Sequence, residues 1–129
     1  MKKKILLVED EPIIHRLLHF ILSKEFDVQS TSNGYEAFLW LERQAIPDLI
    51  IMDWMMPHMD GQTFLKCIKV SGLYGDIPVI ILSSLEGLPE EVDKLPYSVT
   101  RCFQKPFDPI ALKETIGHVF NTSIYGLTN

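Results

Sequence analysis

Residues 48–52, DLIIM, carry four consecutive apolar residues after Asp48, and the run ends directly on a second acid, Asp53. Apolar runs of this length that are rich in β-branched residues are typical of strands buried on both faces, as in a parallel sheet covered by helices. Three similar runs also end on polar groups: KILLV (4–8) on Glu9 and Asp10, PVIIL (78–82) on Ser83, and RCFQ (101–104) on Lys105. Ligand sites of parallel sheets lie at the carboxyl ends of the strands, so we expect these polar groups to meet in one site.

Helical patterns alternate with these strands, and a further short strand is expected in FDVQST (26–31). This alternation predicts a right-handed, doubly wound α/β domain with a parallel sheet. The first helix is expected to begin near Pro12 and to bury Ile13, Ile14, Leu17, Leu18 and Ile21. Asp108 and Pro109 predict the start of the last helix.

Two other helices are expected near 34–44, with Ala37, Phe38 and Leu41 inward, and after Asp60-Gly61, with Phe64, Leu65 and Ile68 buried. The remaining helix, near Leu88, is expected to span only about two turns, because Pro96 interrupts its pattern.

The length and charge of the chain limit its function. A chain of 129 residues predicts one domain, over 1–120, and we expect a frayed tail over 121–129. The net charge of -5, without a basic patch, argues against direct binding to nucleic acid. No apolar stretch approaches the ~20 residues that span a bilayer, and no signal peptide is visible. Cys67 and Cys102 lack CxxC spacing, so we expect buried free thiols in a cytoplasmic protein.

The polar groups at the four strand ends suit phosphoryl transfer to an aspartate. Magnesium prefers carboxylate, carbonyl and water oxygens, which Glu9, Asp10 and Asp53 can supply. An ionised Asp53 can attack phosphorus without a general base, provided that a cation offsets the repulsion between two anions. Lys105 can take up the remaining charge and Ser83 can hydrogen-bond a phosphoryl oxygen.

Each of these residues also has a simpler interpretation. The acids of residues 9–11 could merely cap the helix that begins at Pro12. Lys105 alone would be an ordinary surface lysine, whereas Asp53 ends an apolar run where an unpaired charge is costly. His15 and His19 have a metal-capable spacing, but no HExxH glutamate lies between them, and we favour two solvated histidines. The joint occurrence of the strand-end groups favours the functional interpretation.

The motifs VEDEP (8–12), IIMDWMMPHMDG (50–61), ILSS (81–84) and QKPF (104–107) resemble the signatures of response-regulator receiver domains of two-component signalling. The resemblance covers about residues 4–120. It implies a flavodoxin-like, CheY-like fold with five helices and a five-stranded sheet in the order 2-1-3-4-5. It also implies a phosphorylation-dependent switch rather than a metabolic enzyme, with only self-phosphorylation and slow self-dephosphorylation.

The resemblance assigns a role to each site residue. Asp53 would be the phospho-acceptor, supplied by a sensor histidine kinase or a histidine phosphotransfer protein. Mg²⁺, with Mn²⁺ as an alternative, would be bound by Asp10, by Glu9 through water, by Asp53 and by the Met55 main-chain carbonyl. Lys105, expected to precede a cis Pro106, would pair with the phosphoryl group, and Ser83 would report its arrival to an unidentified downstream protein.

One position departs from the family pattern. Receiver domains usually carry Tyr or Phe three residues before the lysine, and this chain has Cys102 there. Phe103 cannot simply replace that ring, because adjacent strand residues point to opposite faces. We therefore hypothesise that phosphorylation chemistry is intact and signal output is unusual.

Other functions remain open as alternatives. The first is a pseudo-receiver, which keeps the fold as a protein-interaction module and no longer depends on phosphorylation. A haloacid-dehalogenase-like phosphatase is disfavoured, because Met55 stands where a second aspartate would act as acid and base. Dinucleotide binding is disfavoured by the absence of GxGxxG after the first strand. Both a stand-alone regulator and a part of a longer chain are compatible with the sequence.

Overall fold

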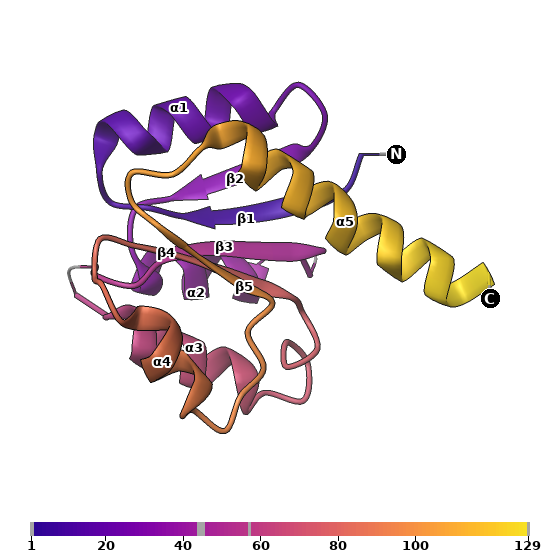
Figure 1. Ribbon diagram of the computed structural model, residues 1–129. Coiled ribbons are helices and arrows are strands. Elements are labelled where there is room, and N and C mark those ends of the chain that lie inside the picture. Colours follow the sequence, from indigo (N-terminus) through magenta and orange to yellow (C-terminus); the bar gives the residue numbers. More distant parts are fainter. Residues whose placement is uncertain (1, 44–45, 57, 129) are drawn as a thin grey trace.

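The structure is a computed structural model, and it describes residues 2–43, 46–56 and 58–128. Within these residues a five-stranded sheet has the order β2-β1-β3-β4-β5, and every neighbouring pair is parallel (Figure 1). Its strands are β1 (Lys4–Val8), β2 (Asp27–Thr31), β3 (Leu49–Asp53), β4 (Val79–Ser83) and β5 (Arg101–Gln104). The predicted α/β class and the strand order implied by the family resemblance are confirmed.

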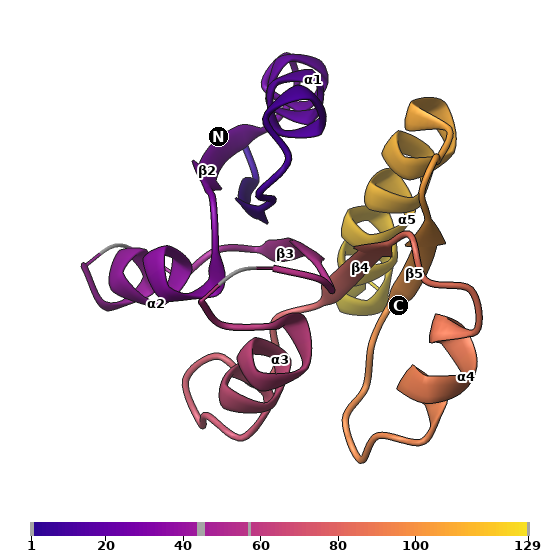
Figure 2. The same ribbon diagram turned by 90° about the vertical axis from the view of Figure 1, so that its left-hand side faces the viewer.

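The helices cover both faces of the sheet. They are α1 (Pro12–Leu22), α2 (Gly34–Arg43), α3 (Gly61–Lys69), α4 (Leu88–Asp93) and α5 (Pro109–Thr128). Figure 2 shows α1 and α5 on one side of the sheet and α2, α3 and α4 on the other. This is the doubly wound arrangement that alternating strands and helices predict.

Two apolar cores lie on the two faces of the sheet. Leu6, Val8, Ile50 and Met52 pack with α2, α3 and α4 on one face. Their neighbours along the same strands belong to the other core, with α1 and α5: Ile5, Leu7, Leu49 and Ile51. Residues that follow one another in a strand point to opposite faces, so strands buried on both sides must be apolar at every position.

The helix starts follow the polar residues of the sequence. The Asp60 side chain accepts a hydrogen bond from the Thr63 main-chain N–H, at 2.8 Å, before α3. Asp108 does the same for Ile110, at 2.9 Å, and caps α5 as predicted. Gly87, with φ of 74°, precedes α4, which has only six residues and is followed by irregular chain, as expected from Pro96.

The predicted buried face of α1 is partly wrong. Ile13 is 81 % exposed and Leu17 is 43 % exposed, whereas Leu18 and Leu22 are buried. Residues i, i+4 and i+7 or i+8 lie on one face of a helix, and only one such face of α1 can lie against the sheet. The adjacent pairs of isoleucines and leucines left two rotations of the helix compatible with the sequence.

Two further expectations differ from the structure. The last helix continues to Thr128, so the segment expected to fray after residue 120 is helical over the residues described, and no proline interrupts it. The domain boundary at residue 120 stays a prediction. Cys67 is exposed rather than buried, and Cys102 is half-buried; both are free thiols.

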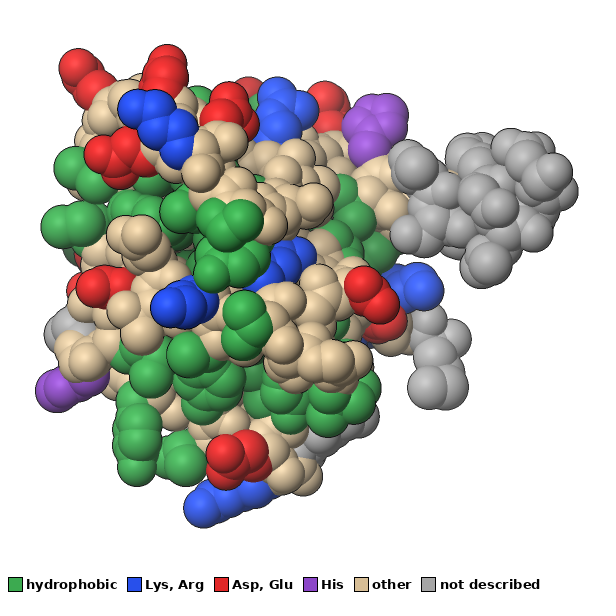
Figure 3. Space-filling view, turned by 90° about the horizontal axis from the view of Figure 1, so that it is seen from below, with side chains coloured by type: hydrophobic (Ala, Val, Ile, Leu, Met, Phe, Trp, Pro, Cys, Tyr) green, Lys and Arg blue, Asp and Glu red, His purple; other side chains and the backbone are tan. Residues whose placement is uncertain are grey.

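The described surface carries several large apolar side chains. Val70 and Leu73, which follow α3, are 66 % and 62 % exposed. Figure 3 views the side on which α3 and α4 lie, and hydrophobic side chains gather there between scattered acids and bases. No described helix is both long enough and apolar enough to cross a membrane.

Candidate functional site

The candidate site lies at the carboxyl ends of four strands. Glu9 and Asp10 follow β1, Asp53 and Ser83 are the last residues of β3 and β4, and Lys105 follows β5. The strand ends are aligned because Asp53 is paired with Leu82, and Ser83 with Gln104. The structure therefore brings together the strand-end groups that the sequence singled out.

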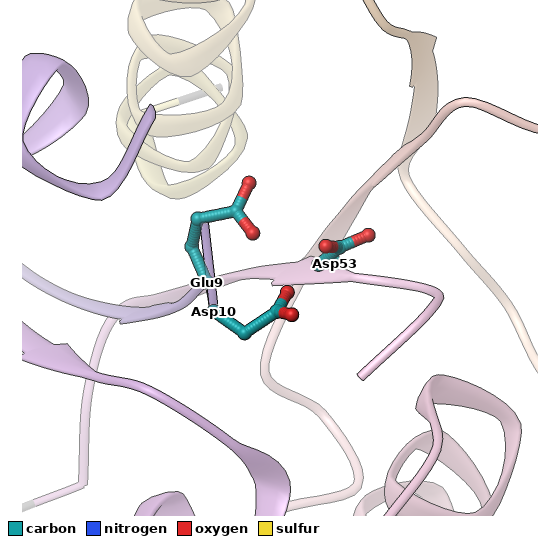
Figure 4. A group of neighbouring side chains, drawn as sticks. All are labelled: Glu9, Asp10 and Asp53. Atoms are coloured by element: carbon teal, nitrogen blue, oxygen red, sulfur yellow. The ribbon is translucent and has the colours of Figure 1, made fainter. Parts of the chain in front are cut away.

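Three carboxylates form the centre of the site. Glu9, Asp10 and Asp53 each have a ligand atom within 4.8 Å of the others. Figure 4 shows the three side chains close together at the ends of β1 and β3, with the Asp10 carboxylate directed toward Asp53. Glu9 is 0 % exposed and Asp53 is 3 % exposed, so water solvates these charges poorly.

Lys105 supplies the positive charge of the site. Its Nζ lies 2.7 Å from Glu9 Oε1, 3.1 Å from Asp53 Oδ2 and 3.4 Å from Glu11 Oε1. The first contact is an ion pair whose angles do not meet those of a hydrogen bond, and Glu9 Oε1 has no other partner among the described residues. The Lys105–Pro106 peptide bond is cis, as the family resemblance implied.

Burial and like charges disfavour ionisation of two of the acids. Burial is the main cause that raises the pKa of Asp53, and the neighbouring Glu9 adds to it while Lys105 opposes it. Burial also raises the pKa of Asp10, with further contributions from Asp53. For Lys105, burial acts to lower the pKa, but its interactions with the Glu9 and Asp53 carboxylates outweigh burial and the pKa is raised.

The main chain after β3 fixes the Asp53 side chain. The Met55 N–H donates to Asp53 Oδ1 at 3.2 Å, and the Gly61 N–H donates to the Trp54 carbonyl at 2.9 Å. A Cβ atom on Gly61 would lie 2.6 Å from the Trp54 carbonyl oxygen, which is closer than real Cβ contacts. Glycine is therefore required where α3 starts, because the chain returns this closely to the site.

Ser83 lies beside the acid cluster and beneath α4. It is 0 % exposed, and its Oγ accepts a hydrogen bond from the Leu85 N–H at 3.1 Å. A small cavity of about 40 Å³ separates Ser83 from Leu88 and Cys102. Cys102 packs with the α2–α4 core and Phe103 with the opposite core, which confirms that Phe103 points away from the position of the usual ring.

The donor set fits a hard divalent cation. Asp10 Oδ1 is buried and has no hydrogen-bond partner within the described part of the chain. A buried carboxylate oxygen without a partner is costly, and it is the atom that a cation would satisfy. Only oxygen donors are offered by this cluster, which is the preference of Mg²⁺.

Two contacts at the site have no counterpart in the sequence reasoning. Glu11 reaches Lys105, although its position suggested only a helix cap. His15 Nδ1 lies 3.0 Å from the Glu9 carbonyl oxygen, and His19 Nδ1 lies 2.6 Å from Ser30 Oγ. The two histidines of α1 thus have separate partners, and neither belongs to the described acid cluster. Sequence spacing alone gave no signal for the Glu11 contact.

Comparisons with known proteins agree with this geometry. The chain matches the response regulator receiver domain family over residues 5–117, and it belongs to that family. It is 31 % identical over 122 residues to the chemotaxis protein CheY1 of Helicobacter pylori (strain J99), covering 93 % of this chain and 98 % of that protein.

Solved structures show the same fold. The signal receiver domain of a signal transduction histidine kinase from Syntrophus aciditrophicus is 30 % identical, with a TM-score of 0.82, and covers 93 % of this chain and 91 % of its own. The receiver domain of a sensor histidine kinase from Pseudomonas aeruginosa PAO1, solved with a magnesium ion coordinated in its active-site cleft, is 27 % identical. Its TM-score is 0.76, and the match covers 88 % of this chain and 93 % of that one. Receiver domains are signalling modules of two-component systems rather than metabolic enzymes.

Proposed function

We propose that this chain is a phosphorylation-dependent switch that accepts a phosphoryl group on Asp53. The observation that carries the proposal is the position of the Asp53 carboxylate, with two other carboxylates within 4.8 Å and the Lys105 ammonium 3.1 Å away. An anionic nucleophile can meet an anionic phosphoryl group only where cations offset the repulsion. This site offers a place for a metal cation beside the Lys105 ammonium.

Each residue has a defined task in the proposed reaction. Asp53 attacks phosphorus through a carboxylate oxygen, and the bond from phosphorus to the donor imidazole nitrogen breaks with its electrons. Asp10, Asp53, the Met55 carbonyl and, through water, Glu9 would hold Mg²⁺, and the ion would supply charge neutralisation for the transferred group. Lys105 then pairs with a phosphoryl oxygen, and the buried Ser83 hydroxyl turns from Leu85 toward another.

The donor in this proposal is a sensor histidine kinase or a histidine phosphotransfer protein. Small phosphodonors serve in self-phosphorylation, and slow self-dephosphorylation returns the chain to its resting state. The magnesium ion in the Pseudomonas aeruginosa receiver supports Mg²⁺ as the resident ion, with Mn²⁺ as an alternative. The output is contact with a downstream protein in the cytoplasm, without direct binding of nucleic acid or membrane.

A second candidate, the pseudo-receiver, is favoured by the region that would transmit the signal. Cys102 replaces the usual ring, and α4 has only six residues. Amide exchange with and without a beryllofluoride phosphoryl mimic separates the alternatives. If amide exchange does not change outside the site, the pseudo-receiver is favoured. A change in amide exchange that is confined to Leu85 and α4 favours a switch with unusual output. A change that extends across both α4 and β5, as in a standard response, would refute our hypothesis of unusual output.

The proposal is tested by intact mass after incubation with acetyl phosphate, with and without Mg²⁺. We expect one phosphoryl adduct that requires Mg²⁺ and is lost in Asp53→Asn. Asp48→Asn is the matched control, because the Asp48 carboxylate accepts a hydrogen bond from the Lys4 N–H at the start of β1, at the end of the strand opposite to the site. No adduct on the parent chain, or an adduct that persists in Asp53→Asn, would overturn the proposal.

A further inference from the structure

The Glu11 carboxylate is an additional partner of Lys105 at the rim of the site. Glu11 Oε1 lies 3.4 Å from Lys105 Nζ. The side chain of Glu11 is 55 % exposed, whereas those of Lys105, Glu9 and Asp53 are 8 %, 0 % and 5 % exposed. Among the described contacts of Lys105, Glu11 is therefore the one on the solvent side.

The local structure gives Glu11 no competing task. It occupies the N-cap position of α1, but its side chain makes no capping hydrogen bond. Its main-chain N–H donates to Glu9 Oε2 at 3.4 Å, so the backbone of Glu11 faces the acid cluster while its carboxylate extends to the rim. The side chain is thereby free to hold the ammonium group.

A cation that enters the acid cluster must compete with Lys105. The ammonium contacts Glu9 and Asp53, two of the three carboxylates that would face the cation. Two positive charges a few ångströms apart repel each other strongly in a site of low dielectric. When the cation takes Asp53 directly and engages Glu9 through water, both of these contacts of Lys105 are weakened, and Glu11 is its one described carboxylate partner outside the acid cluster.

We propose that Glu11 is a positioning residue that receives the Lys105 ammonium when a divalent cation occupies the acid cluster. It lowers the cost of displacing Lys105 from Asp53 and so strengthens cation binding. This deepens, and rests on, the proposed phosphoryl-accepting function, because the same cation and the same Lys105 serve the phosphoryl transfer. It also adds an anion that competes for Lys105 with the phosphoryl group of the donor.

The test is a Mg²⁺ titration followed by Trp54 fluorescence, in a Trp40→Phe background so that one tryptophan reports. We expect Glu11→Gln to weaken Mg²⁺ binding by about two- to five-fold, the range of an exposed ion pair. The loss should shrink at high salt, because screening weakens exposed charge interactions. Glu11→Asp keeps the charge and should bind Mg²⁺ more nearly as the parent chain does.

Glu36→Gln is the matched control. Glu36 is an exposed acid in the first turn of α2, so it removes the same charge without a contact to Lys105. Equal Mg²⁺ affinities in Glu11→Gln and the parent chain would overturn the inference, as would an equal loss in Glu36→Gln. Because the titration needs no phosphoryl transfer, Mg²⁺ binding without any mass adduct would refute the proposed function alone.

A second measurement uses the phosphorylation rate at saturating Mg²⁺. Glu11→Gln should accept the phosphoryl group from acetyl phosphate about two- to five-fold faster, since Lys105 no longer has to leave an anion for the donor. A rate equal to or below that of the parent chain would contradict the competition between Glu11 and the phosphoryl group.

Discussion

Asp10 illustrates how a single carboxylate can weaken the fold and serve the site. One of its oxygens is buried without a hydrogen-bond partner among the described residues, and it faces Asp53. The charge is therefore unfavourable until a cation arrives. A residue of this kind makes stability depend on both pH and Mg²⁺.

Asp10→Asn should stabilise the Mg²⁺-free protein. Burial, and then Asp53, raise the pKa of Asp10 above its ordinary value of 3.8, so the unfolded chain loses this proton first as the pH rises. Between the pKa of Asp10 in the unfolded chain and its higher pKa in the folded chain, the folded chain holds more protons. In this range the free energy of unfolding falls with increasing pH. In EDTA at pH 7 we expect a Tm about 2–4 °C above that of the parent chain, and a shallower decline of stability as the pH rises above the ordinary pKa of 3.8.

Calorimetry in EDTA and in Mg²⁺ checks this prediction. Excess Mg²⁺ should raise the Tm of the parent chain more than that of Asp10→Asn, because ligand binding stabilises only the chain that binds it. A lower Tm for Asp10→Asn in EDTA at pH 7 would contradict the argument.

At the level of single residues, the sequence predicted which polar groups lie together at the strand ends. Each predicted group ends or follows an apolar run: Glu9, Asp10, Asp53, Ser83 and Lys105. The aligned ends of the parallel strands bring these groups to one edge of the sheet. The contact of Glu11 with Lys105 could not be predicted in this way. It depends on side-chain torsions and on the direction of the chain between β1 and α1, which spacing does not determine.

At the scale of the element, α1 shows the limit of pattern reading. Ile13 and Ile14 are adjacent, as are Leu17 and Leu18, so a rotation of one residue gives an equally apolar face. The structure resolves this ambiguity by burying Leu18 at 0 % exposure and leaving Ile13 at 81 %. The existence of the helix was predictable, and its rotation came from packing against the sheet.

Alanine substitutions in α1 should report this rotation. Leu18→Ala should lower the free energy of unfolding by about 2–4 kcal/mol, since it leaves a cavity under the helix. Ile13→Ala should change it by no more than about 0.5 kcal/mol. Urea unfolding followed by circular dichroism measures both, and similar losses in the two variants would show that α1 packs with another face.

Two glycines in helices should respond to alanine in opposite ways. In Gly61→Ala the new Cβ would meet the Trp54 carbonyl, so we expect a loss of about 2–3 kcal/mol together with weaker Mg²⁺ binding. Gly117, in α5, has nothing within 4 Å of the position that a Cβ would take, and Gly117→Ala should stabilise the chain by about 0.5–1 kcal/mol. Thermal unfolding of both variants is the measurement, and a stable Gly61→Ala protein would refute the close approach.

For the whole molecule, α5 links the apolar core to the end of the chain. Phe120 is 7 % exposed and its ring centroid lies 5.5 Å from that of Phe26. Figure 1 shows the helix continuing past the sheet beyond this point. The sequence predicted the start and the core-facing part of the helix, but it did not predict the continuation of the helix to Thr128.

Truncation should locate the boundary of the folded unit. A chain that ends at Phe120 should unfold within about 2 °C of the parent chain, because every described apolar contact of the core is kept. A chain that ends at Val119 loses the Phe120 ring and should be less stable by about 3–5 kcal/mol. If the chain ending at Phe120 also loses this stability, the folded unit extends beyond residue 120.

The strand order also determines when the site can form during synthesis. Glu9, Asp10 and Asp53 leave the ribosome long before Lys105, which follows the last strand of the sheet and whose ammonium group pairs with Glu9 and Asp53. A nascent chain that has completed only β1 to β4 would have to bury several acids with no ammonium beside them, which opposes early closure of the sheet. We therefore expect stable folding only after β5 and Lys105 have emerged. The charge pattern of the site favours a domain that folds as one unit, rather than one whose strands are added to a stable sheet during synthesis.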